Sequence, residues 1–188
     1  MNSQWLILIY KVPSELSAKR VALWRKLKAL GAVYLQNGVC LLPKSDEHQR
    51  ALKILENDIA KMKGEAVLLE TTALEPVQEE KVVTRFNADR DEAYAEFLER
   101  CDGFEQEIER ESAGGKFTYA ELEENDEDLK KLRIWFEKIQ KLDFYGASLA
   151  GKAEKRLKAC GKLLDSFAKE VFDAQAENKP APPDDEAA

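Results

Sequence analysis

Residues 11–43, KVPSELSAKRVALWRKLKALGAVYLQNGVCLLP, decide the fold. They combine the end of a strand, a basic helix and a hairpin. Ser14 is a candidate N-cap and Gly31 a candidate C′ residue, so a helix is predicted from about Glu15 to Leu30. Asn37-Gly38 lies between two short apolar runs, which is the strongest local signal for a β-hairpin. This stretch therefore predicts a helix followed by two antiparallel strands.

The flanking sequence extends this pattern on both sides. QWLILIYKV before Pro13 is apolar without alternation, which predicts a buried strand. Ser45 can cap a second helix that runs to about Lys63 and is closed by Gly64. EAVLLETT then predicts a further strand. The order β-α-β-β-α-β predicts a ferredoxin-like lobe over residues 1–74, an antiparallel four-stranded sheet with two helices on one face.

The rest of the chain is predicted to be helical, which makes the fold α+β. A short helix is expected from about Pro76 to Phe86, and a long helix to about Glu111 is expected to begin at an Asn87 or Asp89 cap. Two more amphipathic helices follow, the first capped by Thr118. About three long helices with short connections predict an antiparallel bundle over residues 75–178. Residues 179–188 are expected to form a disordered tail.

Charge is distributed unevenly along the chain. The net charge is −7, but residues 1–63 contain eleven Lys and Arg against five Asp and Glu, so they carry +6 and the remainder carries −13. A polyanion, if bound, would meet the basic half. Two alternatives stay open: the halves attract each other, or the asymmetry has no role.

Residues for catalysis or metal binding are scarce. His48 is the only histidine, and no serine motif accompanies it. Cys40, Cys101 and Cys160 are far apart, which suits core packing better than a disulfide framework or a metal knuckle. The acidic run 121–129 lacks the spacing of a calcium loop. We therefore expect no enzyme, no catalytic residue, no cofactor and no metal.

No membrane segment or signal peptide is recognisable, so a cytoplasmic protein without a membrane partner is expected. The basic helix is then the main binding signal. Its cations, together with the one at the preceding strand end, could contact successive DNA phosphates. A solvated helix face explains the same pattern equally simply. The predicted DNA-binding residues are Lys11, Lys19, Arg20, Arg25, Lys26 and Lys28.

A family resemblance adds to this interpretation. The string WLILIYKVPSELSAKRVALWRKLKALGAVYLQNGVCLLP, with RFNADRDEAYAEF, GKFTYAELEENDEDLKKLRIWFEKI and DFYGA, resembles the N-terminal domain of the ChrB family, bacterial regulators of chromate resistance. The resemblance implies a regulator that binds operator DNA. Longer members carry a second domain, which puts chromate sensing by this chain in doubt.

More distant resemblances are to PaaX-type repressors and small CRISPR-associated endonucleases. These endonucleases place an aspartate just after the first strand, where this chain has Lys11 after Tyr10, which argues against nuclease activity. Two alternative functions remain open. The chain could be a protein-interaction or homodimerisation module, or it could sense chromate through a basic pocket formed by Lys11 and Arg20.

Overall fold

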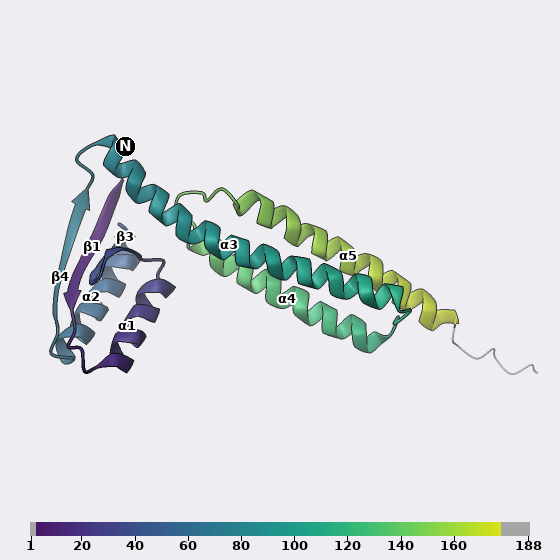
Figure 1. Cartoon of the computed structure of the whole chain (residues 1–188). Coiled ribbons are helices and arrows are strands. Elements are labelled where there is room, and N and C mark those ends of the chain that lie inside the picture. Colours follow the sequence, from purple (N-terminus) through teal and green to yellow (C-terminus); the bar gives the residue numbers. More distant parts are fainter. Residues whose placement is uncertain (1–2, 178–188) are drawn as a thin grey trace, which may run out of the picture. The chain divides into compact units, whose positions relative to one another are not determined.

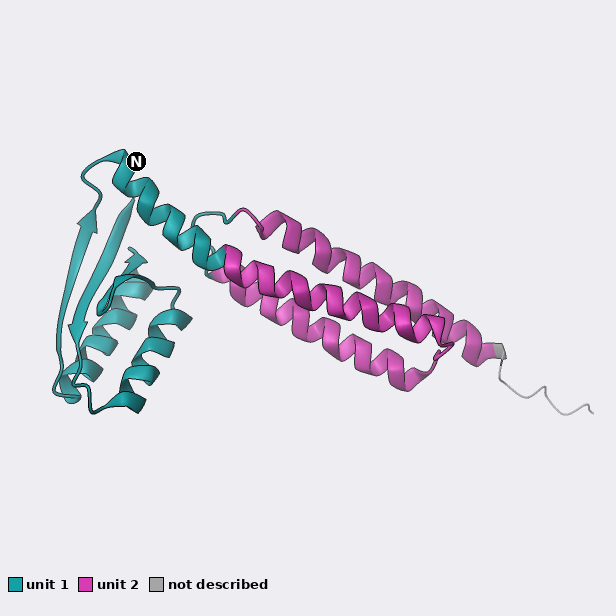
Figure 2. Ribbon diagram, in the orientation of Figure 1, with its two compact units in different colours: residues 1–90, 142–147 teal, residues 91–141, 148–188 magenta. Residues whose placement is uncertain are grey.

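The computed structural model describes residues 3–177, and the predicted tail at 179–188 lies outside them. The chain divides into two compact units (Figure 2). The first unit contains residues 1–90 and 142–147, and the second contains residues 91–141 and 148–188. The first unit therefore extends past the expected boundary at residue 74 and takes up a short segment from much later in the chain.

The first unit has the predicted α+β architecture. Its four strands form one antiparallel sheet in the order β2-β3-β1-β4, which is the order of the ferredoxin-like split βαβ unit (Figure 1). Two helices lie on one face of this sheet. The elements are β1 (Gln4–Lys11), α1 (Ser17–Ala29), β2 (Val33–Gln36), β3 (Val39–Pro43), α2 (Asp46–Lys61) and β4 (Glu65–Thr72).

Local signals explain most of these boundaries. The Ser45 hydroxyl accepts a hydrogen bond from the His48 amide at 3.1 Å, which confirms the predicted cap of α2. Gly38 has φ +73°, as the predicted hairpin requires. The end of α2 differs from the prediction, because Lys63 adopts the left-handed conformation at φ 57°. Gly64 is needed for space instead, since a Cβ there would lie 2.6 Å from the Lys11 carbonyl oxygen.

Helix α1 begins later than predicted. Its first residue is Ser17, and Leu16 occupies the N-cap position without a side-chain hydrogen bond, so the Ser14 cap was wrong. Residues 14–15 form a turn after Pro13. Only Leu23 and Leu27 of the helix are buried, whereas Trp24 is 49% exposed. Leu23 and Leu27 therefore form a narrow buried stripe, and Trp24 lies at its edge.

Apolar side chains cover both faces of the sheet. On the helical face, Leu6 and Leu8 of β1 pack with Leu23, Leu27 and residues of α2. On the other face, a smaller cluster contains Trp5, Val33, Leu41 and Phe86. Phe144 and Tyr145 from the late segment pack against it, and Trp5 Nε1 donates to the Tyr145 hydroxyl at 2.8 Å. This contact explains why residues 142–147 belong to the first unit.

The second unit contains the three predicted long helices, α3 (Pro76–Ala113), α4 (Tyr119–Lys141) and α5 (Ala150–Glu177). α3 is continuous, so the predicted helix start at Asn87 or Asp89 was wrong. Buried Phe86 and Tyr94 lie on either side of that point, and their packing keeps the chain helical through residues that otherwise favour caps. The first turns of α3 belong to the first unit (Figure 2).

Aromatic and aliphatic side chains fill the core of the bundle. Phe97 is fully buried and lies 5.5 Å from Phe136 and 5.7 Å from Trp135, measured between ring centroids. The Thr118 hydroxyl accepts from the Glu121 amide at 3.2 Å, which confirms the predicted cap of α4. The buried core residues from the three helices include Cys101, Phe104, Ile108, Leu129, Leu132, Ile139, Ala153, Cys160, Leu164, Phe167 and Val171.

Candidate nucleic-acid interface

A groove of about 700 Å³ lies between the end of β1, the hairpin and α1. Lys11 and Arg20 both line it, so the two cations that the sequence suggested for a basic pocket do share one surface. Because they come from a strand end and from the first turns of α1, the groove depends on the fold of the first unit. Its other lining residues are Tyr10, Val12, Ser17, Val21, Trp24, Tyr34, Asn37 and Gly38.

The predicted DNA-binding cations divide into two groups. Lys26 Nζ lies 2.9 Å from Asp58 Oδ2, and Lys28 Nζ lies 2.6 Å from Asp89 Oδ2. The other four, Lys11, Lys19, Arg20 and Arg25, are exposed and form no ion pair with any residue between 3 and 177. These four present their full charge to solvent, whereas Lys26 and Lys28 would have to exchange a carboxylate for a phosphate.

Sequence reasoning missed the exposed apolar part of the groove. Trp24 and Val21 are 49% and 45% exposed. Trp24 follows Arg20 by four residues on the same side of α1, which places an aromatic ring and a guanidinium together. The i,i+4 spacing is visible in the sequence, but the exposure of Trp24 is not. Such a pair can contact a phosphate and the flat face of a base or sugar next to it.

Two tyrosines, Tyr10 and Tyr34, are among the residues that line the groove. The Tyr10 and Tyr34 hydroxyls lie 2.9 Å apart and form a hydrogen bond. Burial raises the pKa of both phenols above the usual value of 10.0. Both are therefore neutral at physiological pH and can hydrogen-bond an anionic ligand without repelling it. The groove combines two cations, neutral hydroxyls and an exposed ring.

Comparison with known proteins identifies the family. A family model described as Protein ChrB, N-terminal, matches residues 20–178. The chain belongs to the ChrB N-terminal family. It is also 27% identical over 164 residues to Protein ChrB of Cupriavidus metallidurans. This alignment covers 87% of the chain but 47% of the relative, so the chain spans about half the length of the curated relative it matches.

The region matched by the family model contains four of the six predicted DNA-binding residues. Arg20, Arg25, Lys26 and Lys28 lie within it, as does Trp24, whereas Lys11 and Lys19 precede it. A chromate-resistance association comes with the family. It does not assign a ligand to the groove, so the binding role has to be argued from the geometry.

The histidine and the three cysteines of this ChrB-family chain take part in packing. His48 is half-buried, with Nδ1 2.7 Å from the Pro43 carbonyl oxygen and its ring centroid 5.4 Å from that of Phe144. Cys40, Cys101 and Cys160 are all buried. In the described part of the chain, no group of three or more His, Cys, Asp or Glu side chains could hold a metal ion. No helix there is long and apolar enough to cross a bilayer.

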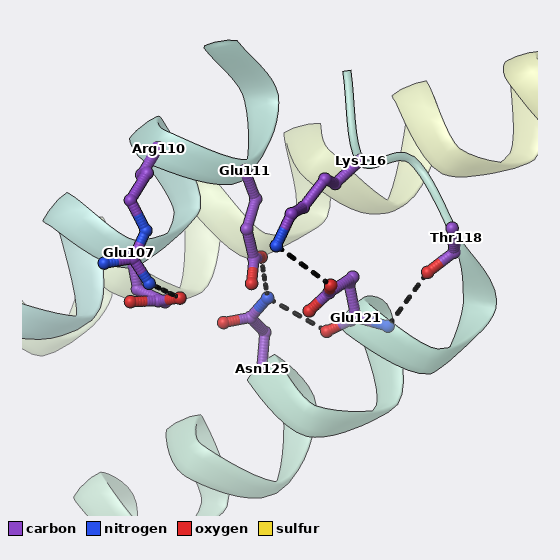
Figure 3. Close-up of polar contacts among 7 residues, drawn as sticks. All are labelled: Glu107, Arg110, Glu111, Lys116, Thr118, Glu121 and Asn125. Carbon is purple, nitrogen blue, oxygen red and sulfur yellow. Dashed lines mark hydrogen bonds and ion pairs between the residues drawn. The ribbon is translucent and has the colours of Figure 1, made fainter. Parts of the chain in front are cut away.

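A second hollow, of about 680 Å³, lies between α3 and α4 and differs in charge from the groove. Its lining includes Glu99, Glu107, Glu124 and Asp128, so it does not suit a polyanion. Figure 3 shows its polar end, where Asn125 bridges Glu111 and the Glu121 backbone while Lys116 approaches the Glu121 carboxylate at 3.6 Å. These contacts join α3 to α4 and satisfy one another, which gives this end a structural role.

Proposed function

We propose that this chain is a non-enzymatic regulatory protein of the chromate-resistance type that binds operator DNA through α1 and the end of β1. The observation that carries the proposal is a set of four exposed cations near the N-terminus of a chain whose net charge is −7. They are Lys11, Lys19, Arg20 and Arg25, and none of them forms an ion pair within residues 3–177. Unpaired cations gain most from phosphate contact, because no internal ion pair has to be broken. A cytoplasmic location is part of this proposal.

The cations have different expected contributions. Arg25, Lys19 and the two groove residues contact phosphates directly, and Trp24 packs against the sugar or base beside the Arg20 contact. Lys26 and Lys28 contribute less, since Asp58 and Asp89 already neutralise them. The phosphate contacts position the protein without reading the sequence, so preference for an operator requires further contacts.

The test is fluorescence anisotropy of labelled DNA from upstream of the protein's own operon, titrated with salt and compared with scrambled DNA. The variant Lys19→Ala/Arg25→Ala removes two unpaired cations and should lower the salt slope by about 2, since each phosphate contact accounts for about 1. Arg50→Ala/Lys53→Ala on α2 is the matched control, because it removes the same charge from exposed positions of the same unit. Equal weakening by both variants would refute the assigned surface, and no binding at low salt would refute DNA binding.

A second candidate function follows from the groove alone. Lys11 and Arg20 line one hollow with two neutral tyrosine hydroxyls, which is a suitable donor set for a small oxyanion such as chromate. Calorimetric titration with chromate, with sulfate as the control, tests it. Heat with chromate that is lost in Arg20→Ala supports an effector site, and absence of heat eliminates it.

A further inference from the structure

A third hollow, of about 420 Å³, lies in the first unit, where the face of the sheet opposite α1 and α2 meets the first turns of α3 (Figure 1). Volumes of about 300–1,000 Å³ are usual for small-molecule sites. All four strands, the connection after β4 and α3 contribute to its lining. The lining residues are Trp5, Ile7, Leu35, Leu41, Thr71, Thr72, Ala73, Gln78, Lys81, Val82 and Arg85.

The strands give this hollow an apolar floor. Trp5 and Leu41 are buried beneath it, while Ile7 is half-buried and Leu35 is 44% exposed. The Trp5 indole N–H already donates to the Tyr145 hydroxyl, so Trp5 offers the hollow apolar ring surface rather than a hydrogen-bond donor. A ligand on this floor would therefore gain mainly by burying apolar groups.

One wall of the hollow is positively charged. Gln78, Lys81 and Arg85 follow one another at steps of three and four residues, which places them on one side of α3. Both cations are exposed, and neither forms an ion pair with another residue in the described range 3–177. None of the lining residues is acidic. The wall therefore presents two charges without an internal counterion.

The acidic residues near this wall have other partners or face elsewhere. Glu79 Oε1 accepts from the Ser3 amide at 2.8 Å and from the Ser3 hydroxyl at 2.6 Å. Glu70 of β4 forms an ion pair with Lys44. Glu75 and Glu80 are exposed and do not line the hollow. An anion that neutralises the wall has to come from outside the first unit.

We propose that this hollow binds a small amphipathic anion, a carboxylate with an aliphatic or aromatic body. The carboxylate lies between Lys81 and Arg85, with the Gln78 amide as a further donor, and the body covers Ile7 and Leu35. A nucleic-acid backbone would contact the two cations and leave the apolar floor unused. A neutral apolar molecule would cover the floor and leave the cations without an anion. The two features together favour a ligand that has both parts.

This inference goes beyond the proposed function and does not depend on it. None of the six predicted DNA-binding residues lines this hollow, and α1 lies on the other face of the sheet. Loss of ligand binding and loss of DNA binding can therefore be observed separately.

Calorimetric titration of the full chain with octanoate tests the site. We expect a dissociation constant on the order of 100 µM. Acetate has the charge without the body, and octanol has the body without the charge, so each should bind at least about tenfold more weakly. No binding of octanoate at about 5 mM would overturn the proposal. Octanol that binds as tightly as octanoate would overturn it as well, because the cations would then have no role.

A matched pair of double variants tests the charged wall. Lys81→Gln/Arg85→Gln should weaken octanoate binding at least about tenfold while the circular dichroism stays the same. Lys53→Gln/Arg50→Gln is the control, because it removes one lysine and one arginine from exposed positions of α2 in the same unit. Equal weakening by the two double variants would show that octanoate responds to overall charge and would refute the assigned site.

A second pair of variants tests the floor, and vesicles test the source of the ligand. Leu35→Ser should weaken octanoate binding, whereas Ile54→Ser, at a 61% exposed position of α2, should not. Equal effects of these two variants would contradict the assigned floor. The chain should not sediment with phosphatidylcholine vesicles that contain oleate. Sedimentation with these vesicles without any binding of free octanoate would assign the anion to a membrane and overturn a site for a free ligand.

Discussion

Asn125 of α4 donates from Nδ2 to Oε2 of Glu111 on α3 at 2.6 Å, with the two residues only 3% and 4% exposed. The same amide nitrogen lies 2.9 Å from the Glu121 carbonyl oxygen, one turn earlier on α4. Burial raises the pKa of Glu111 above its usual value of 4.5, and the neighbouring Glu121 carboxylate adds to the rise. The bundle therefore contains a carboxyl group that binds a proton more tightly when folded than when unfolded.

The burial of Glu111 makes the stability of the protein depend on pH. Because the folded state holds the extra proton, Glu111 lowers the free energy of unfolding as pH rises from its usual pKa through its raised folded pKa. Glu111→Gln removes this titration while keeping an oxygen that can accept from Asn125. We expect the variant to be more stable than the unchanged chain at about pH 8, with the difference shrinking towards about pH 4.

Urea denaturation at several pH values measures this difference. Glu109→Gln is the control, because Glu109 is exposed on the same helix. A Glu111→Gln variant that is less stable at every pH would show that the charged carboxylate, rather than its proton, holds the two helices together.

Removing the Asn125 side chain, which donates to Glu111, should lower the stability of the protein. Asn125→Ala leaves the Glu111 carboxylate buried without its amide partner, so the free energy of unfolding should fall by about 1–3 kcal/mol at neutral pH. Thermal denaturation followed by circular dichroism measures the loss. Asn57→Ala on the exposed surface of α2 should change stability little, and an equal loss in both variants would contradict the assigned role of Asn125.

Two glycines should respond in opposite ways to alanine. Gly31 has φ +83°, and a Cβ there would lie 2.8 Å from Phe144 Cε2, so Gly31→Ala should lower stability by about 1–2 kcal/mol or more. Gly103 lies inside α3 with no atom within 4 Å of the added Cβ, so Gly103→Ala should raise stability by about 0.5–1 kcal/mol. Chemical denaturation of both variants checks the pair, and a stabilising Gly31→Ala would contradict the close packing of Phe144.

The three thiols should be unreactive in the folded protein. Burial raises the pKa of Cys40 to about 12. The hydrogen bond with Cys160, together with burial, raises the pKa of Cys101, and the same bond lowers the pKa of Cys160, which is fully buried. All three sulfur atoms are buried, so an aromatic disulfide reagent should reach them only as the chain unfolds. Full reaction of three thiols in denaturant is the internal control. Rapid labelling of any thiol under native conditions would contradict the packing described.

The sequence predicted those parts of the fold that local signals specify. The helix caps at Ser45 and Thr118 and the turn at Asn37-Gly38 depend only on residues close to them in the sequence. The structure confirms the two helices and the hairpin that they delimit. The continuity of α3 could not be predicted in this way. Asn87 has the side chain of a cap residue, and only the burial of its neighbours in both units explains why the helix does not stop there.

The candidate site shows the same limit. Its six cations could be listed from the sequence, but the ion pairs of Lys26 and Lys28 involve carboxylates 32 and 61 residues away in the chain. Trp24 is 49% exposed although it lies next to buried Leu23 in the sequence, and spacing alone does not give that exposure. Long-range contacts therefore decided which of the predicted residues keep a full charge.

Residues 142–147 return to the first unit after α4, and this has a consequence for biosynthesis. A ribosome that has made residues 1–90 has produced all four strands but not Phe144 and Tyr145, which complete the packing against Trp5 and Phe86. The N-terminal unit thus reaches its native core only after translation has passed about residue 147. α3 and α4 are therefore synthesised while the first unit is still incomplete. A nascent chain stalled at this stage would expose the surface around Trp5 and Phe86 to chaperones and proteases.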